Sequence, residues 1–305
     1  MHYFVENNIK LSPVVIFAYN RPNHLKKLLN SLQDNELSNE TDVVIFVDCA
    51  ANPLHKKETK EVERVANLNW KFNSIKIMAR EENYGLRRNI LNGINYMFEN
   101  EDKLIVLEDD LVLSKHFLYF MNYFLDKYKD TEKVWHIGGW NFPNDESDFD
   151  STYFSTLMYC WGWGTWKNRW EKHNQEKYYE FFNFTKKQKY DFDLKNSYNL
   201  SSQLYANKSK KIDTWAIFWY QTIFKNNGLC LYPLKSLVDN IGADGSGENS
   251  GVDSSLRNII NNKLPLKYPE NLEVDEEVMK QKSIFYKSRN MLSKKIIRKI
   301  KKLLN

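Results

Sequence analysis

Short apolar runs alternate with helix-like patterns over the first 140 residues of this sequence. Residues 14–19, VVIFAY, form an uninterrupted run of β-forming side chains, which is typical of a parallel strand buried on both faces. Pro22 suits the first position of a following helix, and the next leucines share one helical face: Leu25, Leu28, Leu29 and Leu32. The pattern therefore predicts a strand followed by an amphipathic helix.

The same alternation repeats along the chain. Further strands are predicted at 43–47, 75–78 and 104–107, with helices at 57–67 and 86–98. Successive strand–helix steps of this kind predict an α/β fold with a mostly parallel sheet flanked by helices. Because ligands bind at the carboxyl ends of the strands in such a sheet, we expect the chemistry to lie there.

Beyond residue 140 the chain becomes aromatic and loop-rich, with a polar stretch at 171–211. Eight of the 11 glycines fall in three clusters, at 138–139, 162–164 and 242–251, which indicates loops with demanding backbone geometry. Residues 241–247 are too flexible for a strand. We interpret them as a mobile loop that closes over a bound ligand, with an ordinary surface loop as the alternative.

Polar residues follow three of the predicted strands, at 19–21, at Asp48 and at 108–110. Three adjacent carboxylates repel one another, so the sequence EDD at 108–110 is costly unless a cation compensates. Mg²⁺ and Mn²⁺ prefer oxygen ligands, and Mg²⁺ sites commonly combine one or two carboxylates with substrate phosphates. The triplet therefore indicates a divalent metal bridged to a nucleotide diphosphate, with a solvated acidic turn as the alternative.

The segment NYGLRRN at 83–89 opens a helix just after the third strand. Gly85 permits close backbone approach, and a helix N-terminus beside Arg87 and Arg88 attracts phosphate. The alternative is a helix start with solvated arginines, and the residues alone favour it.

Four of the nine tryptophans fall within ten residues, at 161–170. Flat aromatic faces stack well on sugar rings, and the neighbouring glycines give a ligand room to approach. Because tryptophans this dense also build cores, we expect one or two to contact ligand and the others to pack. Asp213 precedes an aromatic helix at 215–224, where an Asp is either a helix cap or a general base, and the residues alone favour the cap.

Composition narrows the class of protein. A chain of 305 residues that is 42% hydrophobic and 27% charged is expected to fold, as one large or two ordinary domains. Cys49, Cys160 and Cys230 are far apart, which argues against a disulfide framework and a structural zinc site and fits a reducing compartment. We expect neither a signal peptide nor a spanning helix, because no stretch approaches ~18 apolar residues.

The basic charge is concentrated at the C-terminus. Residues 287–305 carry eight positive charges and no acid, so the rest of the chain has a net charge of −3 although the whole chain has +5. Five apolar residues of this tail can share one helical face, which predicts an interfacial helix on an anionic membrane surface: Leu292, Ile296, Ile300, Leu303 and Leu304. A solvated tail or partner helix is the alternative; no nucleic-acid motif accompanies the tail, so no nucleic-acid partner is expected.

Taken together, these segments resemble the GT-A fold glycosyltransferases, close to the bacterial family 2-like enzymes and to the N-acetylglucosaminyltransferase I type. The likeness runs from about Ser12 to about Gly251. Its pieces come in the family's order: VVIFAYNRP, VD at 47–48, NYGLRRN, VLEDDL at 106–111, VWHIGGWN at 134–141, WGWGTW, DTW at 213–215 and CLYPLKSLVDNIG at 230–242.

The resemblance implies roles for particular residues. Asp110 is similar to the direct ligand of Mn²⁺ (or Mg²⁺), and Glu108 and Asp109 would orient the nucleotide-sugar. Asp213 resembles the general base of an inverting enzyme. Further residues would bind the nucleotide, its base or its diphosphate: Ala18, Asn20, Arg21, Asp48 and Arg88. Trp140, Trp161, Trp163 and Trp215 are the candidates for sugar or acceptor contact.

The resemblance also implies a domain plan and a function. We expect a GT-A domain over 1–265, with a nucleotide-sugar-binding half at 1–140 and an acceptor-binding half at 141–265, and then a C-terminal extension at 266–305 with a basic amphipathic tail. The stretch at 171–211, which separates the tryptophan loop from Asp213, is longer than expected of the eukaryotic relatives.

The expected reaction is metal-dependent, inverting transfer of a sugar from a nucleotide-sugar, UDP-linked by resemblance, to a glycan or lipid-linked glycan in bacterial surface polysaccharide synthesis. The expected location is cytoplasmic, peripheral on the inner face of the cell membrane. One alternative is a sugar-phosphate nucleotidyltransferase, but FAYNRPNHLKK lacks the glycine-rich loop of those enzymes. Another is a non-catalytic glycan-binding or scaffold protein of GT-A fold, against which the intact EDD and DTW weigh.

Overall fold

The structure is a computed structural model of the whole chain. It describes Phe4, Asn7 and residues 9–144, 148–173, 184–246 and 253–303, with side chains up to residue 291. Residue 247 of the predicted loop and the apolar side chains predicted for the tail, from 292 onward, lie outside the described residues.

The first half of the chain forms four parallel strands, as the hydrophobic pattern predicts. They are β1 (Val14–Ala18), β2 (Asp42–Val47), β3 (Ser74–Ala79) and β4 (Lys103–Glu108). They lie in the order β3-β2-β1-β4, with Val14 opposite Val43 on one side and Ile105 on the other. Because all four run the same way, their carboxyl ends meet at one edge of the sheet, where the polar clusters follow.

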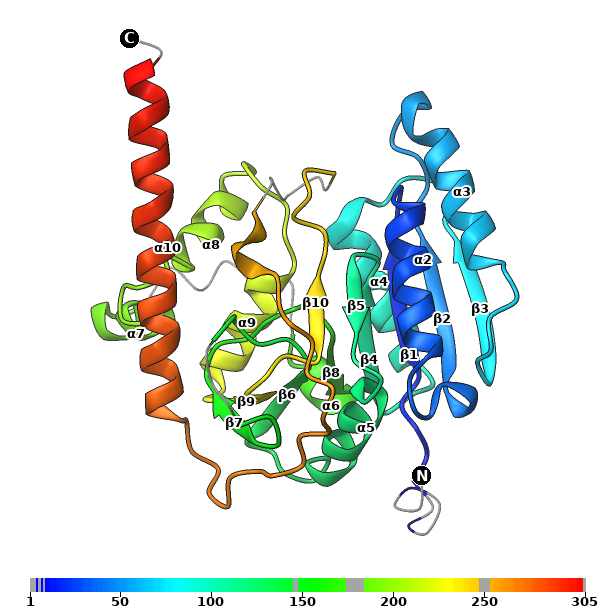
Figure 1. Cartoon of the computed structure of the whole chain (residues 1–305), viewed down its shortest axis with the longest axis horizontal. Coiled ribbons are helices and arrows are strands. Elements are labelled where there is room, and N and C mark those ends of the chain that lie inside the picture. The colour runs from blue at the N-terminus through cyan, green and yellow to red at the C-terminus, as the bar shows by residue number, and fades with distance from the viewer. Residues whose placement is uncertain are drawn as a thin grey trace.

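Helices cover both faces of these strands. They are α2 (Pro22–Gln33), α3 (Lys56–Ala66) and α4 (Gly85–Phe98), with the short 3₁₀ helices η1 (Ser38–Glu40) and η2 (Pro53–His55) between them. In Figure 1, α2 and α3 lie in front of the sheet and α4 behind it, as right-handed crossovers that step outward and then back require. Gly93 lets α4 approach the sheet closely, since a Cβ there would lie 2.4 Å from the ring of Phe17.

The chain after β4 continues the same sheet. Its strands are β6 (Val134–Gly138), β7 (Thr152–Ser155), β8 (Trp163–Trp166) and β9 (Leu229–Pro233). β8 pairs antiparallel with both β4 and β6, β9 is parallel to β6, and β7 is antiparallel to β9. The result is one eight-stranded sheet in the order β3-β2-β1-β4-β8-β6-β9-β7, shared by both halves of the chain.

A separate two-stranded ribbon lies beside the carboxyl end of β4. It pairs β5 (Leu111–Leu113) with β10 (Val238–Asn240) in antiparallel register, Asn240 opposite Leu111. The backbone N–H of Ile241 then donates to the carbonyl of Asp110 at 2.8 Å. The ribbon therefore brings the segment after β10 against the last residue of the acidic triplet.

The part of the chain after β4 has a core of large aromatic side chains. Its helices are α5 (Phe117–Lys127), α6 (Lys167–Trp170), α7 (Lys186–Phe192), α8 (Ser201–Lys208) and α9 (Ala216–Lys225), followed by η4 (Ser254–Leu256). Trp163 stacks on Trp215 with ring centroids 5.4 Å apart, and Trp219 of α9 lies 5.0 Å from Trp170. Most of the clustered tryptophans therefore build the core.

The long C-terminal helix α10 (Glu276–Leu303) runs along one side of the molecule in Figure 1, and its Asn290 donates to the carbonyl of Ser197, shortly before α8. Its first turns pack against the core, since Val278, Met279, Lys282 and Tyr286 are buried. The part of the chain expected to be an extension thus contributes to the core before the tail begins. No helix within the described residues combines the length and the apolar composition needed to cross a membrane.

Candidate active site

A pocket of about 470 Å³ lies at the carboxyl ends of β1, β2 and β4. Both halves of the chain line it, because the ribbon and α10 bring later residues to the edge that the first half forms. Eight of the residues expected at the site line this pocket: Ala18, Asn20, Arg21, Asp48, Glu108, Asp109, Asp110 and Trp161. Trp140, Trp163, Trp215, Arg88 and Asp213 are not among the lining residues.

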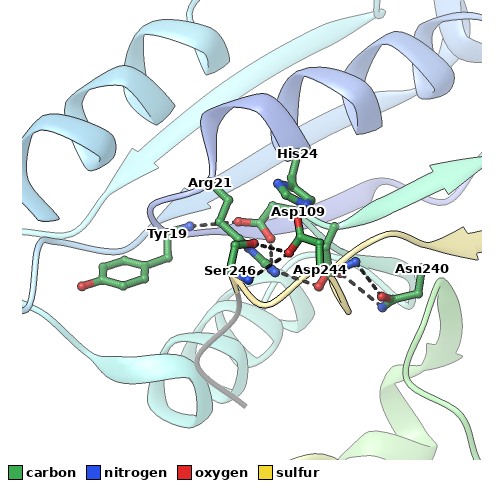
Figure 2. A network of polar contacts seen from close by, with 9 residues as sticks. Tyr19, Arg21, His24, Asp109, Asn240, Asp244 and Ser246 are labelled. Atoms are coloured by element: carbon green, nitrogen blue, oxygen red, sulfur yellow. Dashed lines mark hydrogen bonds and ion pairs between the residues drawn. The ribbon is translucent and has the colours of Figure 1, made fainter. Parts of the chain in front are cut away.

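A single arginine stands between two of the three adjacent carboxylates. Arg21 directly precedes Pro22, which begins α2, and its Nη2 donates to Asp109 and, at 3.0 Å, to Oδ2 of Asp110. Asn240 of β10 lies on the other side, with its Nδ2 3.4 Å from Oδ1 of Asp110. Figure 2 shows this network with the loop after β10, where Asp244 pairs with His24 at 3.2 Å.

The triplet carries more negative charge than its surroundings balance. Burial, together with the charges of Asp110 and Asp109, raises the pKa of Glu108 to about 8. Burial also raises the pKa of Asp109 to about 6, although Arg21 opposes the shift. Burial alone would lower the pKa of Arg21, but Asp109 and Asp110 raise it above its usual value, so Arg21 stays charged. One cation for three carboxyl groups leaves the cluster favourable to a further cation.

The residues around Asp110 fit a hard divalent ion. The negatively charged atoms that could bind a metal here are carboxylate oxygens, which Mg²⁺ and Mn²⁺ prefer as ligands. A Cβ at Gly242 would lie 2.0 Å from Oδ2 of Asp110, so glycine there keeps that side of the carboxylate open. Within the described residues, no group of three or more His, Cys, Asp or Glu side chains is arranged to hold a metal. An ion would therefore rely on one or two carboxylates together with oxygens of a bound diphosphate.

Asp48 is a contrasting carboxylate in the same pocket. Its oxygens accept the backbone N–H groups of Cys49, Tyr84 and Gly85 at 2.8–2.9 Å, and the Nδ2 of Asn83 lies 3.3 Å away. Burial raises the pKa of Asp48 although these donors oppose it. A carboxylate accepts about four hydrogen bonds, so a nucleotide base would have to displace one of these donors. Asp48 therefore holds the start of α4 in place.

Two of the expected site residues that lie outside the pocket lining are charged. Arg88 pairs with Glu82 at 2.9 Å and is about half exposed. Asp213 is 75% exposed and accepts a hydrogen bond from Arg87 at 2.9 Å. The favoured reading of Asp213 from the residues alone, a cap on the next helix, does not hold, because Trp215 is the N-cap residue of α9. Arg87 belongs to the first turn of α4, whose Gly85 and Leu86 line the pocket.

Of the four tryptophans expected to contact sugar, Trp161 lines the pocket. Trp140, Trp163 and Trp215 are buried in the core and present no face to a ligand in this conformation. Trp140 meets Trp161 edge-on at 4.5 Å and so supports it from behind. Burial of the other three follows from the aromatic packing of the second half.

Sequence reasoning missed several lining residues. Tyr198, Asn240, Asp253 and Arg289 line the pocket and all come from the chain after residue 190. Asn240 lies within the CLYPLKSLVDNIG segment, which could have suggested it. Arg289 carried a misleading signal, because it stands in the basic run that predicts a surface tail.

Comparison with protein families identifies the class to which this chain belongs. The model of glycosyl transferase family 2 matches residues 14–196. This chain belongs to that family. The glycosyltransferase match begins at β1 and includes Asp48, the acidic triplet and Trp161, whereas Asp213 and α10 lie outside it. The chain is a glycosyltransferase with a GT-A-like fold.

Solved structures with a partial likeness to this glycosyltransferase include S. aureus TarS 1-349, with 18% identity, a TM-score of 0.38, and coverage of 53% of this chain and 48% of TarS 1-349. A second TarS structure has 17% identity and a TM-score of 0.38 over 54% of this chain and 30% of that one. This chain thus spans half or less of the TarS chains.

The mannosyltransferase PcManGT from Pyrobaculum calidifontis, solved with GDP-Man and Mn²⁺, has 10% identity and a TM-score of 0.40 over 73% of this chain and 76% of its own. No curated protein matches the sequence significantly.

Proposed function

We propose that this glycosyltransferase moves a sugar from a nucleotide-sugar to a glycan or lipid-linked glycan. The donor we propose is UDP-linked, and the transfer uses a divalent metal and inverts the anomeric carbon. One observation carries the proposal: a single arginine pairs with two of three adjacent carboxyl groups at the wall of a pocket of about 470 Å³. A metal–diphosphate pair is the ligand that such an excess of negative charge favours.

The donor roles follow the pocket lining. Ala18, Asn20 and Arg21 surround the nucleotide, Glu108 and Asp109 orient the nucleotide-sugar, and Asp110 binds Mn²⁺ or Mg²⁺. Asp48 contacts the base in exchange for its bond to Asn83. Arg88 reaches the diphosphate or ribose if it leaves Glu82. Trp161 offers an aromatic surface to sugar or acceptor, and Trp140 is a support behind it.

The transfer step is a displacement at the anomeric carbon. An acceptor hydroxyl oxygen forms the new bond to that carbon, and the bond from the carbon to the diphosphate oxygen breaks, the diphosphate leaving with the electron pair. Asp213 takes the hydroxyl proton, which requires it to give up its bond to Arg87. A bound divalent ion supplies electrostatic stabilisation to the departing diphosphate.

The domain plan and the cellular setting are part of the proposal. Residues 1–140 supply the nucleotide-sugar half of the site, and 141–265 supply the acceptor half. The basic segment at 287–305 binds an anionic membrane surface, where a lipid-linked acceptor for surface polysaccharide would lie. Liposome flotation with and without the residues after 291 tests this part, and equal flotation of both proteins would contradict it.

The main test is a thermal-shift panel of nucleotide-sugars with and without Mn²⁺. We expect one donor to raise the unfolding temperature when Mn²⁺ is present, since binding to the native state alone stabilises it. The variant Asp110→Asn should lose the part of the shift that depends on Mn²⁺ and keep the fold. Absence of a shift with every nucleotide-sugar would overturn the proposal.

A further inference from the structure

The C-terminal helix places an arginine in the pocket. Arg289 lies on α10 and lines the same pocket as the acidic triplet, more than 170 residues earlier in the chain. Among the described residues that line the pocket, Arg21 and Arg289 are the basic ones. Because Arg21 is engaged by Asp109 and Asp110, Arg289 is the second positive charge that a ligand in this pocket would meet.

Arg289 is held in place by a carboxylate that a ligand can replace. Its Nη2 pairs with Asp253, and its Nε lies 3.1 Å from the hydroxyl of Ser255. Its side chain is 30% exposed. Although burial opposes the shift, hydrogen bonds from Ser255 and Arg289 lower the pKa of Asp253 to about 2, so the pair is fully charged. The side chain of Arg289 is thus held in position, charged and accessible to a ligand.

A short path of backbone joins Arg289 to the acidic triplet. The N–H of Asp253 donates to the carbonyl of Ala243 at 3.0 Å. Ala243 follows Gly242, whose missing Cβ leaves room for Asp110. The basic group on α10 and the proposed metal ligand therefore border one continuous stretch of the pocket wall.

The position of α10 is fixed by buried contacts rather than by its exposed surface. Lys282 is fully buried, donates to the hydroxyl of Ser155 at 3.0 Å and lies about 5 Å from the rings of Tyr153, Tyr159 and Tyr232. Tyr286, one turn later, stacks on the pocket residue Tyr198 at 4.3 Å. Two turns of the helix are thus anchored directly before Arg289, so its guanidinium is positioned for a ligand.

We propose that Arg289 binds a phosphate group of the substrate and that α10 is thereby a wall of the active site. The guanidinium exchanges Asp253 for two phosphate oxygens, which match its planar donor geometry. This inference rests on the proposed function, and the phosphate comes either from the donor diphosphate or from a phosphate on the acceptor. The helix then contributes to substrate binding whether or not the tail contacts a membrane.

The test is calorimetric binding of UDP, UMP and uridine in Mn²⁺, with GDP in place of UDP if UDP does not bind, and of inorganic phosphate to the protein saturated with the diphosphate. The variants are Arg289→Gln, Arg289→Lys and Asp253→Asn. Arg64→Gln is the matched control, because Arg64 pairs with Glu61 on the exposed face of α3, away from the pocket. Thermal unfolding of each variant checks that the fold is kept.

We expect Arg289→Gln to lower the affinity for one of the phosphate-containing ligands about tenfold or more, and Arg289→Lys to restore part of that affinity. The affinity for uridine should not change. Asp253→Asn should raise the affinity for the same ligand, because it removes the carboxylate that competes for Arg289. Loss of diphosphate binding assigns the donor as the source, and loss of inorganic phosphate binding to the saturated protein assigns the acceptor.

A purely structural pair would behave differently, since Arg289→Gln and Asp253→Asn would then change binding in the same direction or not at all. Either result overturns the inference. If the unaltered protein binds no nucleoside diphosphate, the proposed function itself fails, so the two failures are distinguishable.

Discussion

Asp48 and the acidic triplet line the same pocket but differ in how their charge is balanced. Asp48 faces four donors, three of them backbone N–H groups, and two of these open α4. The three carboxyl groups at 108–110 have Arg21 beside them, which pairs with Asp109 and Asp110. The first carboxylate is satisfied by the fold and shapes the pocket. The second group stays short of positive charge and so favours a ligand. Proximity alone does not tell which acid serves structure and which serves chemistry.

The largest effect is expected from Asp110→Asn. Removing the proposed metal ligand should reduce metal-dependent transfer by about 10³-fold, because a bound ion supplies several kcal/mol of transition-state stabilisation. The measurement is steady-state transfer at saturating Mn²⁺ with the donor found by thermal shift. Transfer at the unaltered rate would show that the triplet does not hold the ion.

A smaller loss is expected from Asp213→Asn. Donor affinity should stay almost unchanged while turnover falls by ~10² or more, the range for loss of a general base. Turnover and donor dissociation constants are measured side by side, with Arg87→Gln as a control that frees Asp213 from its partner. Normal turnover in Asp213→Asn would remove this residue from the mechanism.

Asp48→Asn tests the structural side of the comparison. The amide cannot accept from all the N–H groups at the start of α4, so the free energy of unfolding should fall by about 1–3 kcal/mol. Chemical denaturation measures this, with Asp110→Asn as the counterpart that should cost less, since it relieves a crowded group of charges. Equal destabilisation by both variants would contradict the assignment of a structural role to Asp48 and a ligand-binding role to Asp110.

The smallest effect is a pH dependence of stability with metal chelated. Because the pKa of Glu108 is raised to about 8 in the folded protein, the native state binds more protons than the unfolded chain between about pH 4.5 and pH 8. Stability should therefore decline as pH rises through that window, and Glu108→Gln should flatten the decline. Urea unfolding at pH 5, 6.5 and 8 gives the slopes, and identical slopes in both proteins would contradict the prediction.

Much of the first half of the fold could be predicted from sequence, because its signals are local. The apolar runs of β1, β2 and β4 and the leucine stripe of α2 each predict a buried element from a few neighbouring residues. Parallel strands then bring the polar residues at their carboxyl ends together. The match of family 2 to residues 14–196 covers this same region.

The rest depends on contacts that no local pattern records. Trp163 and Trp215 are buried because they stack on each other across about fifty residues of chain, so their density alone could not separate sugar platforms from core. The residues around Asp213 favour a helix cap, but the next helix begins later, at Ala216. The sequence groups Arg289 with the basic tail because its neighbours in the chain are basic. Its place in the pocket depends instead on the buried contacts of Lys282 and Tyr286, which no local pattern shows.

Gly242 offers a way to separate shape from charge at this site. Its backbone does not need the left-handed region, so alanine can take the same conformation, yet the added methyl group would press on the Asp110 carboxylate. One carbon atom would thus reorient the acid while every ionisable group of the pocket stayed in the sequence. A loss of Mn²⁺-dependent binding in such a variant would be due to the shape of the pocket alone, because its charges would be unchanged.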